Sequence, residues 1–410
     1  MNTFLRTSLA AVLLLLGSLA HAADGPKPKV RAITAFVRLD PAHFETQFDE
    51  AIQVLKDAEA RFQAAGYETE TRRVVTQPLA ELVAGQSETD ALAFLKKIDA
   101  LAALKNVLPN VGPAMLHDSD NPKTVELLGK MLATLPHINA SNIIADDQGI
   151  HWQTIRQTAA MIRYVTDHSV HSQGNFQFTA TAMLKPLGPF YPGTYHVGPG
   201  KQLSLGFEGA GLVKEVFART RGDAKRAVQE LTEALTVHAK VGETIGNEAA
   251  GAHGWTFVGV DPTPAPLGDV SIGAAIETYT GAKFGESGTL GAAYIITSAV
   301  KAVPVKQIGY SGLMVPILED KVLAERWSEG VVTTDALLAY SAVCGTGLDA
   351  VPYPGNISES QLVRILGDVA TLAYKWNKPL SARLLPVKGK KAGDMTEFDS
   401  PYLFNTRLQR

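Results

Sequence analysis

Cys344 is the single cysteine of this 410-residue chain, and glycines follow it at positions 345 and 347. A lone thiol cannot form an intramolecular disulfide, so it is a buried small hydrophobic residue, a reactive group or one half of an intermolecular pair. Nucleophilic use would require a pKa lowered by a histidine, a cation or a helix N-terminus, and the adjacent sequence supplies none of these. The sequence therefore leaves Cys344 open as a nucleophile or as a buried residue.

Two further residues have the chemistry of a general acid or base. His196 lies between aromatic residues and glycines in segment 191–198, where it would transfer protons if a pocket opens; a core histidine with one hydrogen bond is the competing interpretation. Glu208 lies in the glycine-rich segment 206–211, which has the pattern of a turn from a strand into a helix. Its glycine spacing is not a dinucleotide fingerprint, so close helix packing competes with ligand binding.

Asp261 and Asp269 frame a loop that has prolines at 262, 264 and 266 and must be stiff. Rigid loops at strand ends hold ligands in α/β proteins, and the two carboxylates would accept hydrogen bonds or a cation. A structural turn in which Asp269 caps the next helix is the equal alternative.

Segment 309–320 is a second loop with binding character. Ser311 and Gly312 would turn backbone amides toward an anion, and Glu319 follows Pro316 by three residues. The segment matches neither a phosphate-binding loop nor the nucleophile motif of esterases. Nucleotide binding and esterase chemistry therefore lose support.

The evidence for a metal site is weak. His168 and His171 are three residues apart next to Asp167, a spacing that fits one helical face, but their surroundings are polar and no third ligand cluster is evident. Paired acids elsewhere leave a divalent cation open, and oxygen ligands would favour calcium or magnesium. The sequence assigns no metal ligand.

The composition and the first residues indicate the compartment. A formal net charge of -3 gives no electrostatic reason to expect nucleic acid or an anionic membrane as partner. Residues 1–22 contain Arg6, an apolar run at 9–16 and small residues at the end, as in a cleaved secretory signal. The apolar run is shorter than the roughly 20 residues of a membrane-spanning helix. We expect a signal peptide at 1–22, a linker at 23–29 and a periplasmic protein without a membrane span after processing.

Hydrophobic periodicity predicts an α/β fold. A strand at 30–37, a helix at 44–65 and a strand at 69–76 open the chain, and strands alternate with helices at a similar cadence afterwards, including a helix at 334–344. This alternation is typical of a sheet covered by helices. No boundary separates independent domains, so residues 30–410 are expected to form one domain.

Several segments together resemble the DUF711 or UPF0210 family. They are, in family order, Pro262-Thr263-Pro264-Ala265 with Asp269, Ser311-Gly312 with Pro316 and Glu319-Asp320, Cys344 with Gly347-Leu348-Asp349, and Gly393-Asp394-Met395. The resemblance implies a fold like that of pyruvate formate-lyase. That fold is a ten-stranded α/β barrel of two antiparallel halves, each made of parallel strands, wrapped by helices. Cys344 would then lie on a loop inside the barrel.

The resemblance does not extend to glycyl radical chemistry. In that superfamily a cysteine relays a radical from a glycine near the C-terminus, but neither Gly389 nor Gly393 lies in the setting of a radical loop. An exported protein would also be separated from the cytoplasmic activase that such radicals need. We therefore do not expect this activity.

The predicted site lies at the barrel mouth and includes, besides Cys344, the residues Asn142, His196, Glu208, Asp261, Asp269, Ser311, Gly312, Glu319 and Asp349. The first hypothesis is an enzyme, such as a hydrolase or lyase, that acts on a small polar metabolite. A carboxylate or His196 would transfer protons, and Cys344 is the candidate nucleophile. The second is a non-catalytic periplasmic protein that binds a ligand for delivery or sensing. A homo-oligomer is left open in both.

Overall fold

The computed structural model describes residues 27–409. The predicted signal peptide, residues 1–22, and the first part of the predicted linker lie outside these residues. A ten-stranded sheet forms the centre of the described part. Its strands are β1 (Lys29–Phe36), β2 (Arg72–Val75), β3 (Leu108–Pro113), β4 (Asn139–Asp146), β5 (Gly149–Ile150), β6 (Phe178–Ala182), β7 (Gln202–Glu208), β8 (Thr256–Asp261), β9 (Gly347–Pro354) and β10 (Leu380–Val387).

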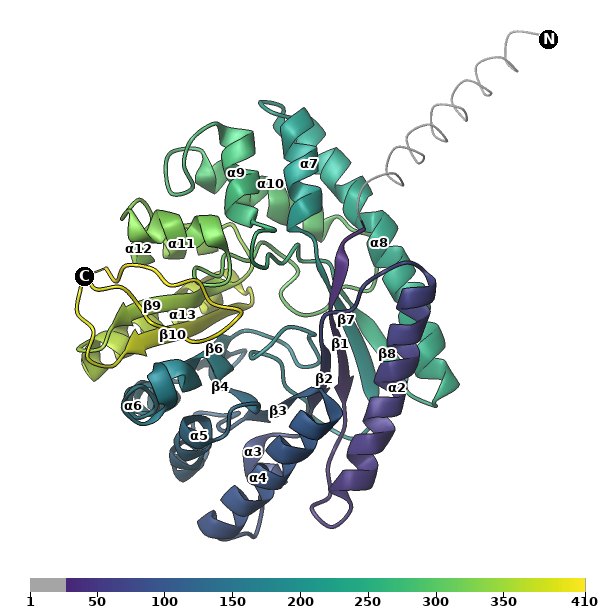
Figure 1. Cartoon of the computed structure of the whole chain (residues 1–410), viewed down its shortest axis with the longest axis vertical. Helices are drawn as coiled ribbons and strands as arrows, with labels where there is room; N and C mark the ends of the chain where they lie inside the picture. The colour runs from purple at the N-terminus through teal and green to yellow at the C-terminus, as the bar shows by residue number, and fades with distance from the viewer. Residues whose placement is uncertain (1–26, 410) are drawn as a thin grey trace, which may run out of the picture.

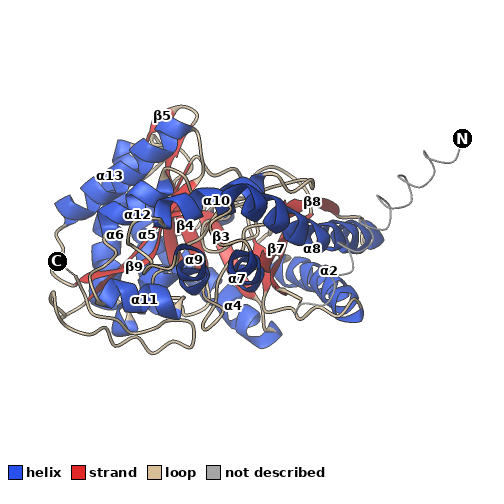
Figure 2. Cartoon of the chain, turned by 90° about the horizontal axis from the view of Figure 1, so that it is seen from above, coloured by secondary structure: helices blue, strands red, loops and turns tan. Residues whose placement is uncertain are grey.

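Helices surround the curved sheet, whereas loops fill its inside (Figure 1). They are α2 (Phe44–Ala64), α3 (Leu79–Leu82), α4 (Glu88–Lys105), α5 (Lys123–Thr134), α6 (Trp152–His168), the 3-10 helix η1 (Val170–Gln177), α7 (Ala210–Arg219), α8 (Ala224–Ala252), α9 (Ile272–Thr280), α10 (Thr289–Lys301), α11 (Lys321–Ser328), α12 (Thr334–Ser341) and α13 (Glu359–Trp376). In the perpendicular view, α6 and α13 lie at one end of the molecule and α2 and α8 at the other (Figure 2).

The strands form two groups that run in opposite directions. Their order is β8-β7-β1-β2-β3-β4-β6-β10-β9, and β5 forms a hairpin with β4. Strands β1, β2, β3, β4 and β6 are parallel to one another. Strand β7 is antiparallel to β1 and parallel to β8, and β10 is antiparallel to β6 and parallel to β9. The two antiparallel junctions therefore separate one parallel group from the other.

Segment 306–317 closes the gap between β8 and β9. At one end, the Val260 amide donates to the Lys306 carbonyl at 3.0 Å and the Ile308 amide donates to the Val260 carbonyl at 3.1 Å. At the other end, the Ile317 amide donates to the Asp349 carbonyl at 3.0 Å. The backbone thus completes a ring, which confirms the predicted α/β barrel of two antiparallel halves.

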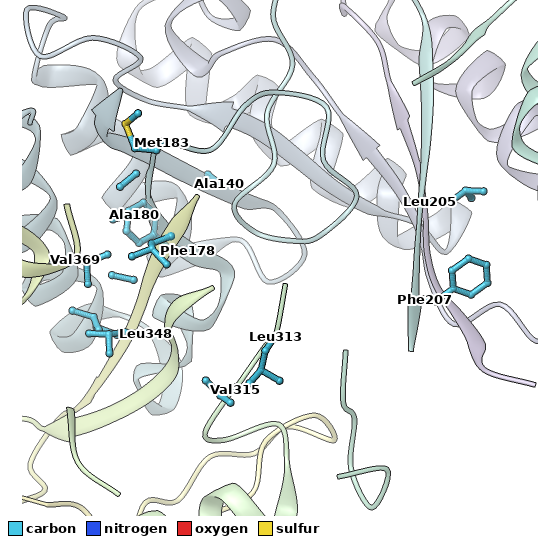
Figure 3. Packing of buried hydrophobic residues seen from close by; sticks show 14 of the residues in the cluster. Ala140, Phe178, Ala180, Met183, Leu205, Phe207, Leu313, Val315, Leu348 and Val369 are labelled. Carbon is cyan, nitrogen blue, oxygen red and sulfur yellow. The ribbon is translucent and has the colours of Figure 1, made fainter. Parts of the chain in front are cut away.

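Alternation along the strands separates an apolar outer face from a polar inner face. On β7, Leu205 and Phe207 point to the same side, toward the helix layer (Figure 3). Phe207 packs there on Phe62 of α2, with ring centroids 6.4 Å apart. Because successive side chains point to opposite faces of a strand, the next residue, Glu208, faces the inside of the barrel. One hydrophobic cluster outside the strands includes residues from Val30 to Leu384.

Loop residues rather than a large apolar core fill the barrel. A separate small cluster of Leu184, Phe190, Ala265, Tyr310 and Met314 lies inside. Its members come from loops after β6 and β8 and from the closing segment 306–317, so these loops determine how much free space remains around the inward-facing polar residues. Within residues 27–409, no helix is both long and apolar enough to cross a membrane.

Candidate functional site

Five charged side chains form a chain of alternating charges across one end of the barrel, which we call the arginine–carboxylate network (Arg31, Glu70, Glu319, Asp349 and Arg383). Arg383 Nε is 2.9 Å from Asp349 Oδ1, and Arg383 also pairs with Glu319. Arg31 Nη2 is 3.2 Å from Glu319 Oε2, and Arg31 Nη1 is 2.9 Å from Glu70 Oε2. Glu319 is therefore shared by two buried guanidinium groups.

Neighbouring structure fixes each member of the network. Arg31, Asp349 and Arg383 lie on β1, β9 and β10, whereas Glu319 lies in the loop before α11. The next residue, Asp320, is fully buried and accepts hydrogen bonds from the Ile272 amide at 2.7 Å and the Leu323 amide at 3.1 Å. It thereby caps α11 and anchors the start of α9, which holds Glu319 in place.

Glu208 extends the network through a second carboxyl group. Burial and the neighbouring Glu70 carboxyl group raise the pKa of Glu208 to about 8. Burial also acts on Glu70, but the neighbouring Glu208 and the charge of Arg31 outweigh it and leave the Glu70 pKa lowered. The pair therefore holds a proton on Glu208 at neutral pH, next to an ionised Glu70.

Arg73 lies beside the network but is not neutralised by it. Its side chain is buried, and it donates from Nε to Thr71 Oγ1 at 3.0 Å and from Nη1 to the Pro189 carbonyl at 3.0 Å. The guanidinium lies 4.7 Å from the centre of the Tyr191 ring. Burial lowers the Arg73 pKa to about 10. Within residues 27–409 no carboxylate lies within 4.0 Å of it, so Arg73 is a buried cation without an ion-pair partner.

Two cavities meet at these arginines. The outer cavity has a volume of about 480 Å³ and the inner one, inside the barrel, about 40 Å³. Both are lined by Arg31, Arg73, Tyr191, Pro192, Glu319 and Arg383. The arginines therefore lie where the outer cavity meets the inner one. We call this junction the throat.

Two of the predicted site residues, Glu319 and Asp349, line the inner cavity. Tyr310, Thr346 and Ser381 also line it. Burial raises the pKa of Asp349 despite the neighbouring Arg383, and burial likewise raises that of Tyr310 well above its usual value. The inner cavity thus combines cations with groups that can hold a proton.

Asp261 and Ser311 shape the loop that carries Tyr310. Asp261 is fully buried and accepts hydrogen bonds from the Tyr310 amide at 2.8 Å, the Ser311 amide at 3.1 Å and the Thr263 hydroxyl at 2.6 Å. Burial raises the Asp261 pKa to about 6, although these hydrogen bonds oppose the rise. Ser311 has a φ of 45°, a left-handed conformation that Asp261 holds through the backbone. Both residues organise the site without lining its cavities.

Cys344 follows the end of α12, and its side chain is fully buried. Burial raises the pKa of its thiol, which the Thr346 amide and the Lys378 cation only partly oppose. Cys344 lines neither cavity, and no histidine or carboxylate in the described part of the chain bonds to it. The glycine after it packs on Gly312, where a Cβ atom would come within 2.6 Å of backbone. Gly312 therefore allows the loop at 309–320 to pack closely on the loop after Cys344.

His196 lies apart from the network. It is fully buried, its ring is 6.2 Å from that of Phe36 at the far end of β1, and neither ring nitrogen has a hydrogen-bond partner within residues 27–409. Burial lowers its pKa to about 4. His196 is therefore neutral at physiological pH and does not line either of the cavities at the arginines.

Asn142 and Asp269 are also outside the site. Asn142 accepts from the Met115 amide at 3.2 Å and donates to the Thr158 hydroxyl at 3.0 Å, so it joins β4 to α6. The Asp269 side chain is 84% exposed and pairs with Lys321 at 3.3 Å. The helix that follows is capped by Ser271, not by Asp269.

The described residues contain no group of three or more His, Cys, Asp or Glu side chains placed to hold a metal ion. Of the two histidines considered for metal binding, His168 donates from Nδ1 to the Tyr164 carbonyl at 2.8 Å, and His171 lines the outer cavity. Glu319 and Asp349 are already engaged by arginines. Calcium or magnesium therefore has no oxygen cage among these residues.

Sequence reasoning missed the arginines that dominate the site. Arg31, Arg73 and Arg383 are not among the predicted site residues. Each lies in a short run of buried residues, and a charged residue inside a buried strand is rare unless it is paired or functional. That pattern is a usable signal in Arg72-Arg73-Val74-Val75 and in Ala382-Arg383-Leu384.

Comparison with known proteins shows a family. The model of the family described as "Uncharacterised ACR (DUF711)" matches residues 24–399. A UPF0210 protein of Pyrobaculum aerophilum is 35% identical over 278 residues, which are 64% of this chain and 59% of the relative. Those of Pyrobaculum islandicum and Listeria monocytogenes serotype 4a are 29% identical over 409 residues and 28% over 346. These two alignments span 91% and 80% of this chain and 88% and 76% of the relatives. The match thus spans about three fifths of the length of the P. aerophilum relative.

Solved structures with detectable similarity are distant. An anaerobic ribonucleotide reductase is 9% identical with a TM-score of 0.31, covering 88% of this chain and 71% of that one. The enzyme from Thermotoga maritima, with citrate in the active site, is 8% identical with a TM-score of 0.33, covering 88% and 81%. The fold assignment therefore rests on the strand order and directions of this chain. By the family match over residues 24–399, the chain belongs to the uncharacterised DUF711 family.

Proposed function

We propose that the protein binds a small anionic metabolite at Arg73 and acts on it by acid/base chemistry. The observation that carries the proposal is the missing counter-charge of Arg73. A buried charge without a partner is costly, and the neighbouring carboxylates are already engaged by Arg31 and Arg383. A ligand carboxylate at the throat would supply the missing negative charge and accept two parallel N–H bonds from one guanidinium.

Asp349 is the best candidate for proton transfer. It lines the inner cavity, and burial raises its pKa, which is the direction that a general acid requires. Glu319, on the opposite side of Arg383, lines both cavities. Because Cys344 lies behind the cavity wall, the proposed chemistry does not use the thiol.

We also propose that the protein is exported. The charge, apolar run and small residues of segment 1–22 support a cleaved signal, and the family match begins directly after it, at residue 24. Fractionation of cells that express the full chain tests this. Protein in the periplasmic fraction, shortened by the mass of the first 22 residues, is expected, and full-length protein in the cytoplasm would contradict the proposal.

Two neighbouring arginines provide a matched test of the site. Arg73 faces the cavities, whereas Arg72 pairs with Glu59 of α2 at 3.6 Å. We expect Arg73→Gln to weaken the binding of simple carboxylates, measured by calorimetry, at least tenfold, and Arg72→Gln to leave it unchanged. Equal affinities in both variants, or no carboxylate binding by the wild-type protein, would contradict the proposal.

A non-catalytic binding protein is the second candidate, favoured by the ion pairs that already occupy Glu319 and Asp349. Incubation of the purified chain with a metabolite mixture separates the two functions. Depletion of an acidic metabolite by the wild-type protein, and not by Asp349→Asn, supports an enzyme. An unchanged mixture, together with a ligand-induced rise in melting temperature, supports binding alone.

A further inference from the structure

We infer that the ligand of the Arg73 site is a monocarboxylate with an extended apolar body, whose carboxylate lies at the throat while the body fills the outer cavity. The inference rests on the proposed anion binding at Arg73 and adds the class of ligand. It is drawn from the size, wall and charge of the two cavities.

The inner cavity is too small for a metabolite. Its volume of about 40 Å³ compares with the roughly 10–15 Å³ that one water molecule needs by the same measure. It therefore has room for a few waters or a carboxyl group. The outer cavity of about 480 Å³ lies within the range of roughly 300–1,000 Å³ that is usual for small-molecule sites. Most of the ligand must lie in the outer cavity.

The wall of the outer cavity combines polar side chains with an apolar part away from the arginines. Leu108, Leu135, Val170, Phe176 and Tyr402 contribute to it from different parts of the chain. Val170 lies at the rim and is 77% exposed. Hydrocarbon or an aromatic ring of the ligand would bury apolar surface against these side chains, which favours binding.

The charges at the outer cavity favour a ligand with a single negative charge. Three arginines, Arg31, Arg73 and Arg383, line the cavity. Arg31 and Arg383 are paired with Glu70, Glu319 and Asp349. Of the three, Arg73 is the one without an ion-pair partner among the described residues, so one negative charge on the ligand would neutralise it. A dicarboxylate would have to place its second charge against the apolar wall.

The experiment compares acetate, butyrate, octanoate and octanol as ligands of the full chain by calorimetry. Burial of one methylene group improves affinity roughly fourfold, so octanoate should bind on the order of a hundredfold more tightly than butyrate. Octanol should bind weakly because it lacks the charge, and Arg73→Gln should remove the advantage of octanoate over octanol.

Two exposed apolar residues provide matched variants of the wall. Val170 lines the cavity and Leu104, on α4, does not, and their exposures of 77% and 79% make both substitutions tolerable for folding. Val170→Glu should weaken octanoate binding at least fivefold, more than it weakens acetate binding. Leu104→Glu should change neither affinity.

The outcomes separate this inference from the proposed function. If acetate and butyrate bind as tightly as octanoate and all three need Arg73, the anion site stands and the apolar body is refuted. If no carboxylate binds, or Arg73→Gln has no effect on any of them, both are refuted. Octanol that binds as tightly as octanoate also refutes both, because the site would then recognise apolar surface alone.

Discussion

Arg31 and Glu319 are 288 residues apart in the chain, yet Arg31 Nη2 lies 3.2 Å from Glu319 Oε2 inside the barrel. The pair joins β1 to the loop before α11, and Arg383 binds the same carboxylate from β10. Because Glu319 and Arg383 are buried and Arg31 is largely so, removal of one leaves the others with an uncompensated charge. The network that lines the site is therefore also expected to matter for stability.

The first prediction concerns this dependence. Arg383→Met should lower the free energy of unfolding by about 3–5 kcal/mol, because Glu319 and Asp349 lose the guanidinium between them. Urea denaturation followed by circular dichroism measures the change. Lys185→Met is the control, since its pair with Asp147 is 69% exposed on both sides and surface pairs contribute little. Similar losses in both variants would show that the network is not stabilising.

The second prediction concerns pH. The folded state keeps a proton on Glu208, with a pKa of about 8, that the unfolded chain releases near 4.5, so stability falls as the pH rises toward 8. Glu208→Gln should flatten this fall, which for one proton is at most about 1.4 kcal/mol per pH unit. Unfolding free energies between pH 6.5 and 8 measure it.

That range excludes His196 and His238 as the cause. The pKa values of His196 and His238 are lowered to about 4 from an unfolded value of 6.5, so their stability is present above pH 6.5 and lost toward pH 4. The lowered pKa of Glu70 affects the free energy of unfolding only below about pH 4.5. Glu68→Gln, on an exposed neighbour, is the control. A profile of Glu208→Gln that matches the wild type would rule out a retained proton at this position.

The third prediction distinguishes the two acids that frame the proline-rich loop. Asp261→Asn should cost about 2–3 kcal/mol, because one oxygen that accepts amide bonds becomes a donor facing other donors. Asp269→Asn should be close to neutral, since that side chain is exposed. Thermal unfolding measures both, and a stable Asp261→Asn variant would contradict the role assigned to the buried carboxylate.

The fourth prediction concerns the thiol. Because Cys344 is the single cysteine of the sequence, a thiol reagent reports on it alone. We expect the folded protein to react at least a hundredfold more slowly than the protein in guanidinium, since the side chain is buried and its pKa is raised. Carboxylate binding should survive in Cys344→Ala. Rapid labelling of the folded protein would instead support the nucleophile hypothesis.

The hydrophobic pattern of the sequence was sufficient to predict the helices that have a clear helical periodicity. The helix expected at 44–65 is found at Phe44–Ala64, and the one expected at 334–344 ends at Ser341, three residues before Cys344. Strands β9 and β10 were not anticipated. Strand β9 contains two prolines and β10 contains Arg383 and a proline, features that normally argue against a buried strand. The polar inner face of the barrel explains why such a sequence is tolerated there.

The site was harder to predict than the fold. Glu319, in the loop 309–320, and Asp349, five residues after Cys344, are predicted site residues, and the structure brings both to the inner cavity. Arg72 and Arg73 are chemically identical in the sequence. Which of them meets the cavity depends on which way β2 faces, and that is decided by pairing with β1 and β3 rather than by local composition.

The distribution of the network along the chain has a consequence for biosynthesis. Arg31 is made among the first residues and Arg383 among the last, so the carboxylate of Glu319 cannot acquire both partners until translation is nearly complete. A nascent or proteolytically shortened chain that lacks β10 would expose Glu319 and Asp349 as unpaired acids within an open half-ring. Only a chain that includes β10 would assemble the complete arginine–carboxylate network.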